Sequence, residues 1–200
     1  MNNAGGEGLI CEGTVVNTIT GSGGSAAVTV RECHGAAGDP EASCVTSSDV
    51  LPAPLSAVDQ CNGSINGAGG TLRCSVEVTN NFVGISANEN DATVNQCVGS
   101  GDGDTSGCDP FPANSINATI TQCNGSANGG TLVELTCTVT GMETSSNSVE
   151  VDQCNDSGNG GGGLVICSAS ITNNFILAPT PMPTPTLAPT PTLAPTATPT

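Results

Sequence analysis

Ten of the eleven cysteines in this 200-residue chain fall into five pairs, and this feature constrains the fold more than any other. A glutamine or a glutamate precedes the first cysteine of each pair, and a segment rich in Gly, Asn and Ser separates it from the second in most pairs. The pairs are Cys33 with Cys44, Cys61 with Cys74, Cys97 with Cys108, Cys123 with Cys137, and Cys154 with Cys167. The first and third pairs have a shorter separation than the other three. Such internal repetition is typical of a chain built from similar stacked units.

The cysteine pairs are predicted to be disulfides rather than metal ligands. No two cysteines have C-x-x-C spacing and the only histidine is His34, so a tetrahedral zinc site lacks both the spacing and the ligands. Disulfides indicate an oxidising compartment outside the cytosol. We expect each first cysteine to pair with the next one, while a ladder that joins neighbouring units stays open as the alternative. Cys11 is left over. Its surroundings look like the second half of a unit, so we expect it to be unpaired, with a partner upstream of Met1.

The flanks of the cysteines have the period-two alternation of β-strands. A β-branched residue stands three positions before each first cysteine, at Val30, Val58, Val94, Ile120 and Val151. Apolar residues alternate in register with the second cysteines, as in Leu72, Cys74, Val76 and Val78. Each unit is therefore expected to be strand, Gly/Asn loop, strand, with the disulfide closing the neck of the loop. No window shows a helical stripe. The predicted fold class is all-β: an array of disulfide-clipped two-stranded units, stacked like a sandwich or a solenoid.

The composition supports a crosslinked fold and excludes several partners. Leu, Ile, Val and Phe make up just under a fifth of the chain, which alone would indicate disorder. Disulfides can stabilise folds whose cores are this small. The formal charge is −16, with Arg31 and Arg73 as the only basic residues besides His34. We therefore expect no binding to nucleic acid or to an anionic membrane surface. No stretch approaches the roughly 20 apolar residues of a membrane span, so we expect no membrane insertion.

The sequence offers little for catalysis and one weak metal pattern. A nucleophilic mechanism needs a base beside the nucleophile, and His34, the single imidazole, has Val98 as its counterpart in the other short pair. We expect no enzyme activity and no cofactor. Asp102, Asp104 and Ser106 place oxygens as an EF-hand loop does, but position twelve is Ala113. We expect an acidic turn there first and a calcium site second.

The chain divides into a repeat region, residues 1–177, and a Pro/Thr-rich segment, residues 178–200. The predicted units lie near 9–32 (partial), 33–56, 57–90, 91–114, 115–146 and 147–177. Proline at every second to fourth position of 178–200 predicts an extended stalk or linker. No export signal is visible near Met1, so we expect a piece of a longer, processed protein.

The repeat Q-C-N-G-S-x-N-G-G, the segment C-D-P-F-P-A from Cys108 and the recurring T-N-N-F (from Thr79 and Thr172) resemble uncharacterised secreted repeat proteins of actinobacterial-type Gram-positive bacteria. The resemblance implies an exported surface protein and no activity. The leading expectation is an extracellular structural or adhesive module on a Pro/Thr stalk, whose partner is an unknown surface ligand or neighbouring repeats. An accessory binding domain of a larger secreted enzyme is the alternative. Ice binding is a third, weakened because no flat threonine lattice repeats.

Overall fold

The computed structural model describes residues 7–36, 39–67, 69–85, 93–101, 107–109, 118–129, 134–140 and 149–177, which form β-strands and turns only. These ranges contain no helix of the length and apolar character that a membrane crossing requires. A seven-stranded sheet contains, in spatial order, β3 (Asp39–Leu51), β2 (Gly23–Ala36), β1 (Glu7–Thr20), β5 (Thr71–Val83), β11 (Leu164–Ile176), β9 (Glu134–Thr140) and β7 (Cys108–Asp109). A four-stranded sheet contains β4 (Ala57–Gln60), β10 (Glu150–Gln153), β8 (Ile120–Gln122) and β6 (Val94–Gln96). The predicted all-β class with disulfides is confirmed.

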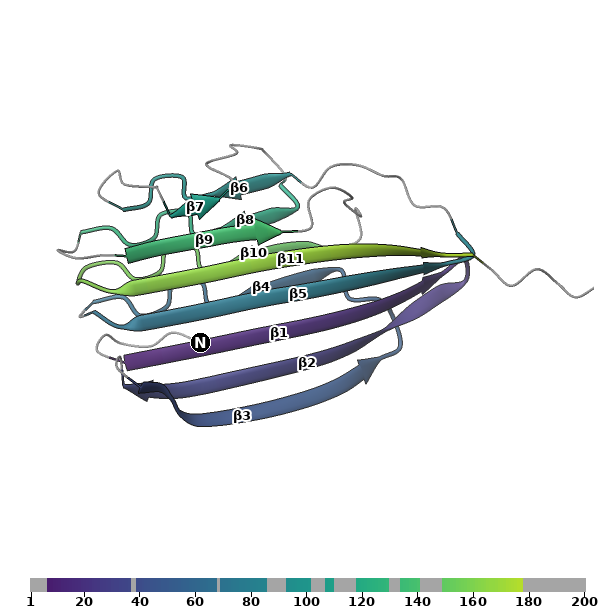
Figure 1. Ribbon diagram of the computed structural model, residues 1–200, viewed down its shortest axis with the longest axis horizontal. Helices are drawn as coiled ribbons and strands as arrows, with labels where there is room; N and C mark the ends of the chain where they lie inside the picture. Colours follow the sequence, from purple (N-terminus) through teal and green to yellow (C-terminus); the bar gives the residue numbers. More distant parts are fainter. Residues whose placement is uncertain are drawn as a thin grey trace, which may run out of the picture.

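The two sheets form two layers, and four repeat units each contribute one strand to both. The first strand of a unit lies in the small sheet and the second in the large sheet, as with β4 and β5 or with β10 and β11 (Figure 1). The two strands of one unit therefore do not pair with each other. They pair in parallel with the equivalent strands of neighbouring units, so the units stack as a short coil. We call the place where each unit leaves its small-sheet strand, at its first cysteine, the corner of that unit; a disulfide joins it to the large-sheet strand, as from Cys61 to Cys74.

The spatial order of the units differs from their order in the chain. The unit 57–83 lies beside 150–176, which lies beside 120–140, which lies beside 94–109. The last unit of the chain thus lies between the first and the third, and β11 separates β5 from β9 in the large sheet (Figure 1). A regular solenoid, in which each unit follows the previous one in space, is not what this chain forms.

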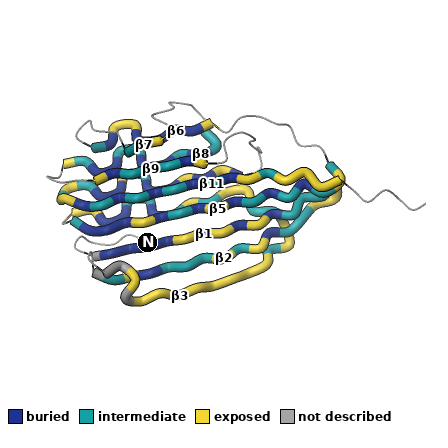
Figure 2. Tube along the Cα trace, in the orientation of Figure 1, coloured by how far each residue is buried: buried dark blue, intermediate teal, exposed yellow. Residues whose placement is uncertain are grey.

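The N-terminal segment extends only the large sheet. β1 pairs in parallel with β5, and β2 and β3 follow in antiparallel register. Figure 2 shows β3 exposed along most of its length, whereas buried and less buried positions alternate along β5 and β11. The predicted unit boundary at residue 33 falls inside β2, and the cysteines 33 and 44 lie opposite each other on the antiparallel pair β2–β3.

The core consists of two buried clusters between the sheets. One cluster is built around the disulfides, with Leu9, Leu72, Val165 and Ile65 among the paired cysteines. The other is aliphatic and contains Val15, Val76, Val78, Val94, Ile120, Val139, Val149, Val151, Ala169 and Ile171. The apolar positions in both clusters come from the alternation in the sequence, which places every second side chain of a strand on the same face. The small apolar content is thus concentrated between the layers.

Candidate functional site

The cysteines form a row that crosses the large sheet. The second cysteines of four units, Cys74, Cys167, Cys137 and Cys108, occupy the same register position on neighbouring parallel strands. Cys11 on β1 occupies that position too, directly opposite Cys74. The register places Cys11 in the second half of a unit, as its sequence surroundings indicate.

The disulfides join the pairs that the spacing predicts. Each corner cysteine bonds to the strand cysteine of its own unit: Cys61 to Cys74, Cys97 to Cys108, Cys123 to Cys137 and Cys154 to Cys167, with a Cα–Cα distance of 6.6 Å in all four. The alternative of a ladder between units is wrong for these residues. Cys33 and Cys44 also bond, but across the antiparallel strands β2 and β3 with Cα atoms 4.0 Å apart. The pairs 33–44 and 97–108 therefore have the same short separation in sequence but different geometries: the first crosses an antiparallel hairpin, and the second joins a corner to a strand.

A row of hydrogen-bonded glutamine side chains connects the units between the two sheets. Gln60, Gln153, Gln122 and Gln96 precede the four corner cysteines and lie side by side on β4, β10, β8 and β6. Each amide donates to the next: Gln60 Nε2 to Gln153 Oε1 over 2.9 Å, Gln153 to Gln122 over 2.7 Å, and Gln122 to Gln96 over 2.7 Å. Gln60, Gln153 and Gln122 also donate to a backbone carbonyl of the large sheet, at Ser75, Ser168 and Thr138. The glutamines thus bind neighbouring units and both layers together.

The corner segments are bound to each other by asparagine and serine side chains. Asn62 Oδ1 accepts from the backbone NH of Asn155, and Asn155 Oδ1 accepts from that of Asn124. Ser157 Oγ donates to the carbonyl of Cys61 over 2.7 Å. The corner cysteines have φ near +60°, a conformation that costs energy for a residue with a side chain, so these bonds and the disulfide must hold it. The repeated Q-C-N-G-S motif is therefore the sequence of an ordered corner.

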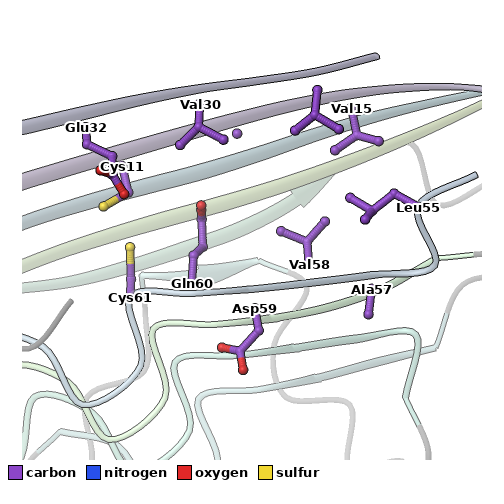
Figure 3. Close-up of a pocket in the computed structure, with 12 residues that line it drawn as sticks. Cys11, Val15, Val30, Glu32, Leu55, Ala57, Val58, Asp59, Gln60 and Cys61 are labelled. Atoms are coloured by element: carbon purple, nitrogen blue, oxygen red, sulfur yellow. The ribbon is translucent and has the colours of Figure 1, made fainter. Parts of the chain in front are cut away.

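The stack is incomplete at one end. The large sheet continues past β5 with β1 and β2, while β4 is the edge strand of the small sheet in the described ranges. A groove of about 310 Å³ lies between β4 and the inner faces of β1, which is buried, and of β2, which is half-buried at Val28, Val30 and Glu32. It is lined by Cys11, Gly13, Val15, Val28, Val30, Glu32, Leu55, Ala57, Val58, Asp59, Gln60 and Cys61. Figure 3 shows Gln60 and Cys61 projecting from β4 and the adjoining corner toward the layer that carries Cys11 and Val15.

Cys11 is the one free thiol among the eleven cysteines, all of which lie in described positions. Its sulfur lies within 4.8 Å of the sulfurs of Cys61 and Cys74, which are already bonded to each other. Burial, and then the charge of Glu32, raise the pKa of Cys11 to about 11. The thiol is therefore protonated at neutral pH and a slow nucleophile. The other close cysteine groups contain only disulfide sulfurs, which are not the thiolates that metals bind.

The other residues with candidate chemistry form no second site within the described ranges. Asp102, Asp104 and Ser106 lie outside the described residues, so the calcium pattern stays a prediction. His34 is exposed on β2 and lies in the antiparallel extension. Asp152 lies opposite Asp59 on the neighbouring strand, and burial, together with the Asp59 charge, raises the pKa of Asp152. Neither the glutamine row nor the groove is among the sites predicted from the sequence. The repeated Gln before each corner cysteine is the sequence signal that indicates the row.

A protein-family model matches most of the chain. The model of a domain of unknown function, DUF8253, covers residues 1–174. The chain matches no curated protein and no solved structure.

Proposed function

The chain belongs to the DUF8253 family, whose description names no activity, and we propose from the geometry that it is an extracellular structural or adhesive surface module without catalysis. The observation that carries the proposal is the continuous crosslinking of the stack. Within the four coil units every corner is closed by a disulfide, and the buried amides of Gln96, Gln122 and Gln153 bind the units together.

The use of the polar side chains supports a structural role. The corner hydroxyls and amides that a binding site would direct outward instead donate to or accept from the next unit, as Ser126 does with Ser157 and Cys154. Neutral amides and hydroxyls held in this way contribute stability and a unique register rather than proton transfer. The chemistry of these corners favours a rigid spacer over an enzyme.

The disulfides support an extracellular location. Stable disulfides persist in oxidising compartments and are rare in the cytosol. The resemblance to secreted repeat proteins of actinobacterial-type Gram-positive bacteria points the same way. Residues 178–200 lie outside the described residues, and the proposal that they form a Pro/Thr stalk is supported by the proline pattern of their sequence.

Surface labelling of intact cells tests this role. An antibody raised against residues 43–50 of the exposed strand β3 is expected to label intact, non-permeabilised cells that carry the protein. The matched control is an antibody against residues 164–171 of β11, whose alternate side chains are buried; it should label only after reduction and unfolding. Labelling by the first antibody only after cell lysis would contradict the surface role.

A second candidate, an accessory binding domain of a larger secreted enzyme, is favoured by the groove beside β4. The groove is partly apolar, with Leu55, Val58 and Val28 in its lining. Carbohydrate-binding faces usually rest on aromatic platforms. Trp and Tyr are absent from the chain, and the described pair Phe82 and Phe175 stack on each other with centroids 5.3 Å apart. Saturable binding on a glycan array would establish this candidate, and the absence of binding to any glycan on the array would rule it out.

A further inference from the structure

We propose that the groove beside β4 is the acceptor site for one further polypeptide strand of the type [V/I]-x-Q-C, supplied from outside these 200 residues, whose cysteine forms a disulfide with Cys11. The strand would lie parallel to β4, on its free edge, and would pair with β4 in the way that β10 pairs with β8. The proposal is independent of the surface role above, since either can fail alone.

The groove continues the line of three strand–strand interfaces in the small sheet. In the small sheet β4, β10, β8 and β6 pair in parallel with aligned glutamines, and every unit adds one strand to each layer. β1 adds its strand to the large sheet only, and the groove occupies the position of its missing counterpart. A strand there would continue the small sheet by the same spacing, along the half-buried side chains of Val28 and Val30 that line the groove.

The hydrogen bonds of the glutamine row all run in one direction. Each glutamine donates to the next one from Gln60 toward Gln96, so Oε1 of Gln60 is the accepting end of the row. This oxygen faces β1: a methyl group at Gly13 would lie 3.5 Å from it. By the repeated geometry, an incoming glutamine donates to Gln60 Oε1 and to the carbonyl of Glu12, which follows Cys11 as Ser75 follows Cys74.

The free thiol occupies the register position of the bonded strand cysteines. The strand cysteines of the four coil units each bond to the cysteine that follows the glutamine of the same unit. Cys11 lies in the same register, is only 6% exposed and lines the groove. A strand that places its glutamine beside Gln60 places the next residue where it can bond to Cys11.

The occupant must come from another polypeptide segment. Every Q-C pair of this chain already bonds within its own unit, so neither the chain nor a second folded copy has a free cysteine of this type. The pair Cys33 and Cys44 offers no free cysteine either, because these two residues bond to each other across the hairpin of β2 and β3. A neutral strand suits the acidic lining of Glu32 and Asp59 better than an acidic one.

The covalent step is a thiol–disulfide exchange. The incoming cysteine is carried as a mixed disulfide with a low-molecular-weight thiol such as glutathione. The Cys11 thiolate attacks the strand's sulfur, a new disulfide forms, the mixed disulfide breaks, and glutathione leaves as the thiolate, which takes up the proton that Cys11 released. Electrons balance without a further oxidant.

The test offers the intact chain a synthetic peptide with the sequence of residues 118–127, ATITQCNGSA, activated as its glutathione mixed disulfide. A control peptide replaces Ile120 by Asp and Gln122 by Ala and keeps the activated cysteine. The adduct on Cys11 is quantified by mass spectrometry of non-reduced digests over time. We expect the matching peptide to modify Cys11 at least about tenfold faster than the control, a difference of ~1.4 kcal/mol. The C11S protein should form no adduct.

Equal rates for the two peptides would overturn the proposal. They would show that the reaction depends only on access to the thiol and not on the Ile and Gln side chains of the peptide. A Cys11–Cys11 dimer formed in preference to the adduct would overturn it as well. A non-covalent check uses the same peptide with Cys123→Ser. It should slow modification of Cys11 by the activated peptide, and failure to compete at saturating concentration would also contradict the proposal.

Discussion

Gln60 Nε2 donates to Gln153 Oε1 over 2.9 Å, although the two residues are 93 positions apart in the chain. This bond joins the first coil unit to the last. It exists because β10 lies beside β4, and it makes the stability of the first unit dependent on residues at the end of the repeat region.

Breaking the glutamine row at its middle should cost more than breaking it at its end. Gln153→Leu removes a fully buried amide that donates to Gln122 and Ser168 and accepts from Gln60. Each buried partner left unsatisfied costs about 1–3 kcal/mol, so we expect a loss of roughly 3 kcal/mol in unfolding free energy. The control, Gln60→Leu, alters the half-buried end of the row and should cost less. Denaturant unfolding of the oxidised proteins measures both, and an equal or larger loss for Gln60→Leu would contradict the row's role.

The disulfides should differ in how far their loss is felt. Replacing Cys154 and Cys167 by Ser opens a corner at the centre of the stack, and we expect a loss of about 3 kcal/mol in global stability, as the chain-entropy model gives for a loop of this length. Replacing Cys33 and Cys44 opens only the outer hairpin, where Cys44 is exposed. Amide hydrogen exchange is expected to rise throughout β5 and β9 in the first variant and only in β2 and β3 in the second. Uniform loss of protection in both would be the opposite result.

Truncation after residue 146 should disrupt the array from its middle. In a linear solenoid the removal of the last unit costs one interface and leaves the others intact. Here the last unit supplies β10 and β11, which separate and bind the first and third units. We expect hydrogen-exchange protection to fall in both β5 and β9, while truncation after residue 177 leaves it unchanged. Protection lost only in the strand nearest the cut would favour sequential stacking.

Removing one carboxylate from the pair Asp59 and Asp152 should stabilise the protein at neutral pH. Burial and the charge of Asp59 raise the pKa of Asp152, so the folded state binds its proton more readily than the unfolded state. Ionised Asp152 therefore lowers stability above its folded pKa, and the penalty disappears as the pH falls through that value toward 3.8, the ordinary value. The Asp152→Asn variant should have a higher Tm than the unsubstituted protein near pH 7 and the same Tm near pH 3. Asp109→Asn, at the far end of the stack, controls for net charge; an equal gain from it would refute the pairwise effect.

The sequence predicts the local structure well and the stacking poorly. Alternation around Leu72 and Val165 and the spacing of the cysteines suffice for the strands and disulfides, because the alternation is local to each strand and each of these disulfides closes within one unit. The three long units carry nearly the same residues at the contact positions, so more than one order of these units satisfies the same hydrogen bonds between Gln, Asn and Ser. The unit 94–109 has Val98 in place of the corner asparagine, and Val98 donates its NH to Asn124 Oδ1 but offers no side-chain acceptor, so this unit fits the end of the row. The position of β11 between β5 and β9 is not specified by the repeat pattern. For the same reason the groove beside Cys11 becomes visible only when β1 is placed next to β5.

The direct test of this account is the order of strands in the large sheet, measured by interstrand NOEs in an isotope-labelled, oxidised sample. We predict NOEs between the backbones of Val76 and Ala169 and of Ala169 and Val139, which are in-register neighbours. NOEs that place β5 directly beside β7 or β9, with β11 at the edge, would contradict the stack and with it the crosslinked module proposed above.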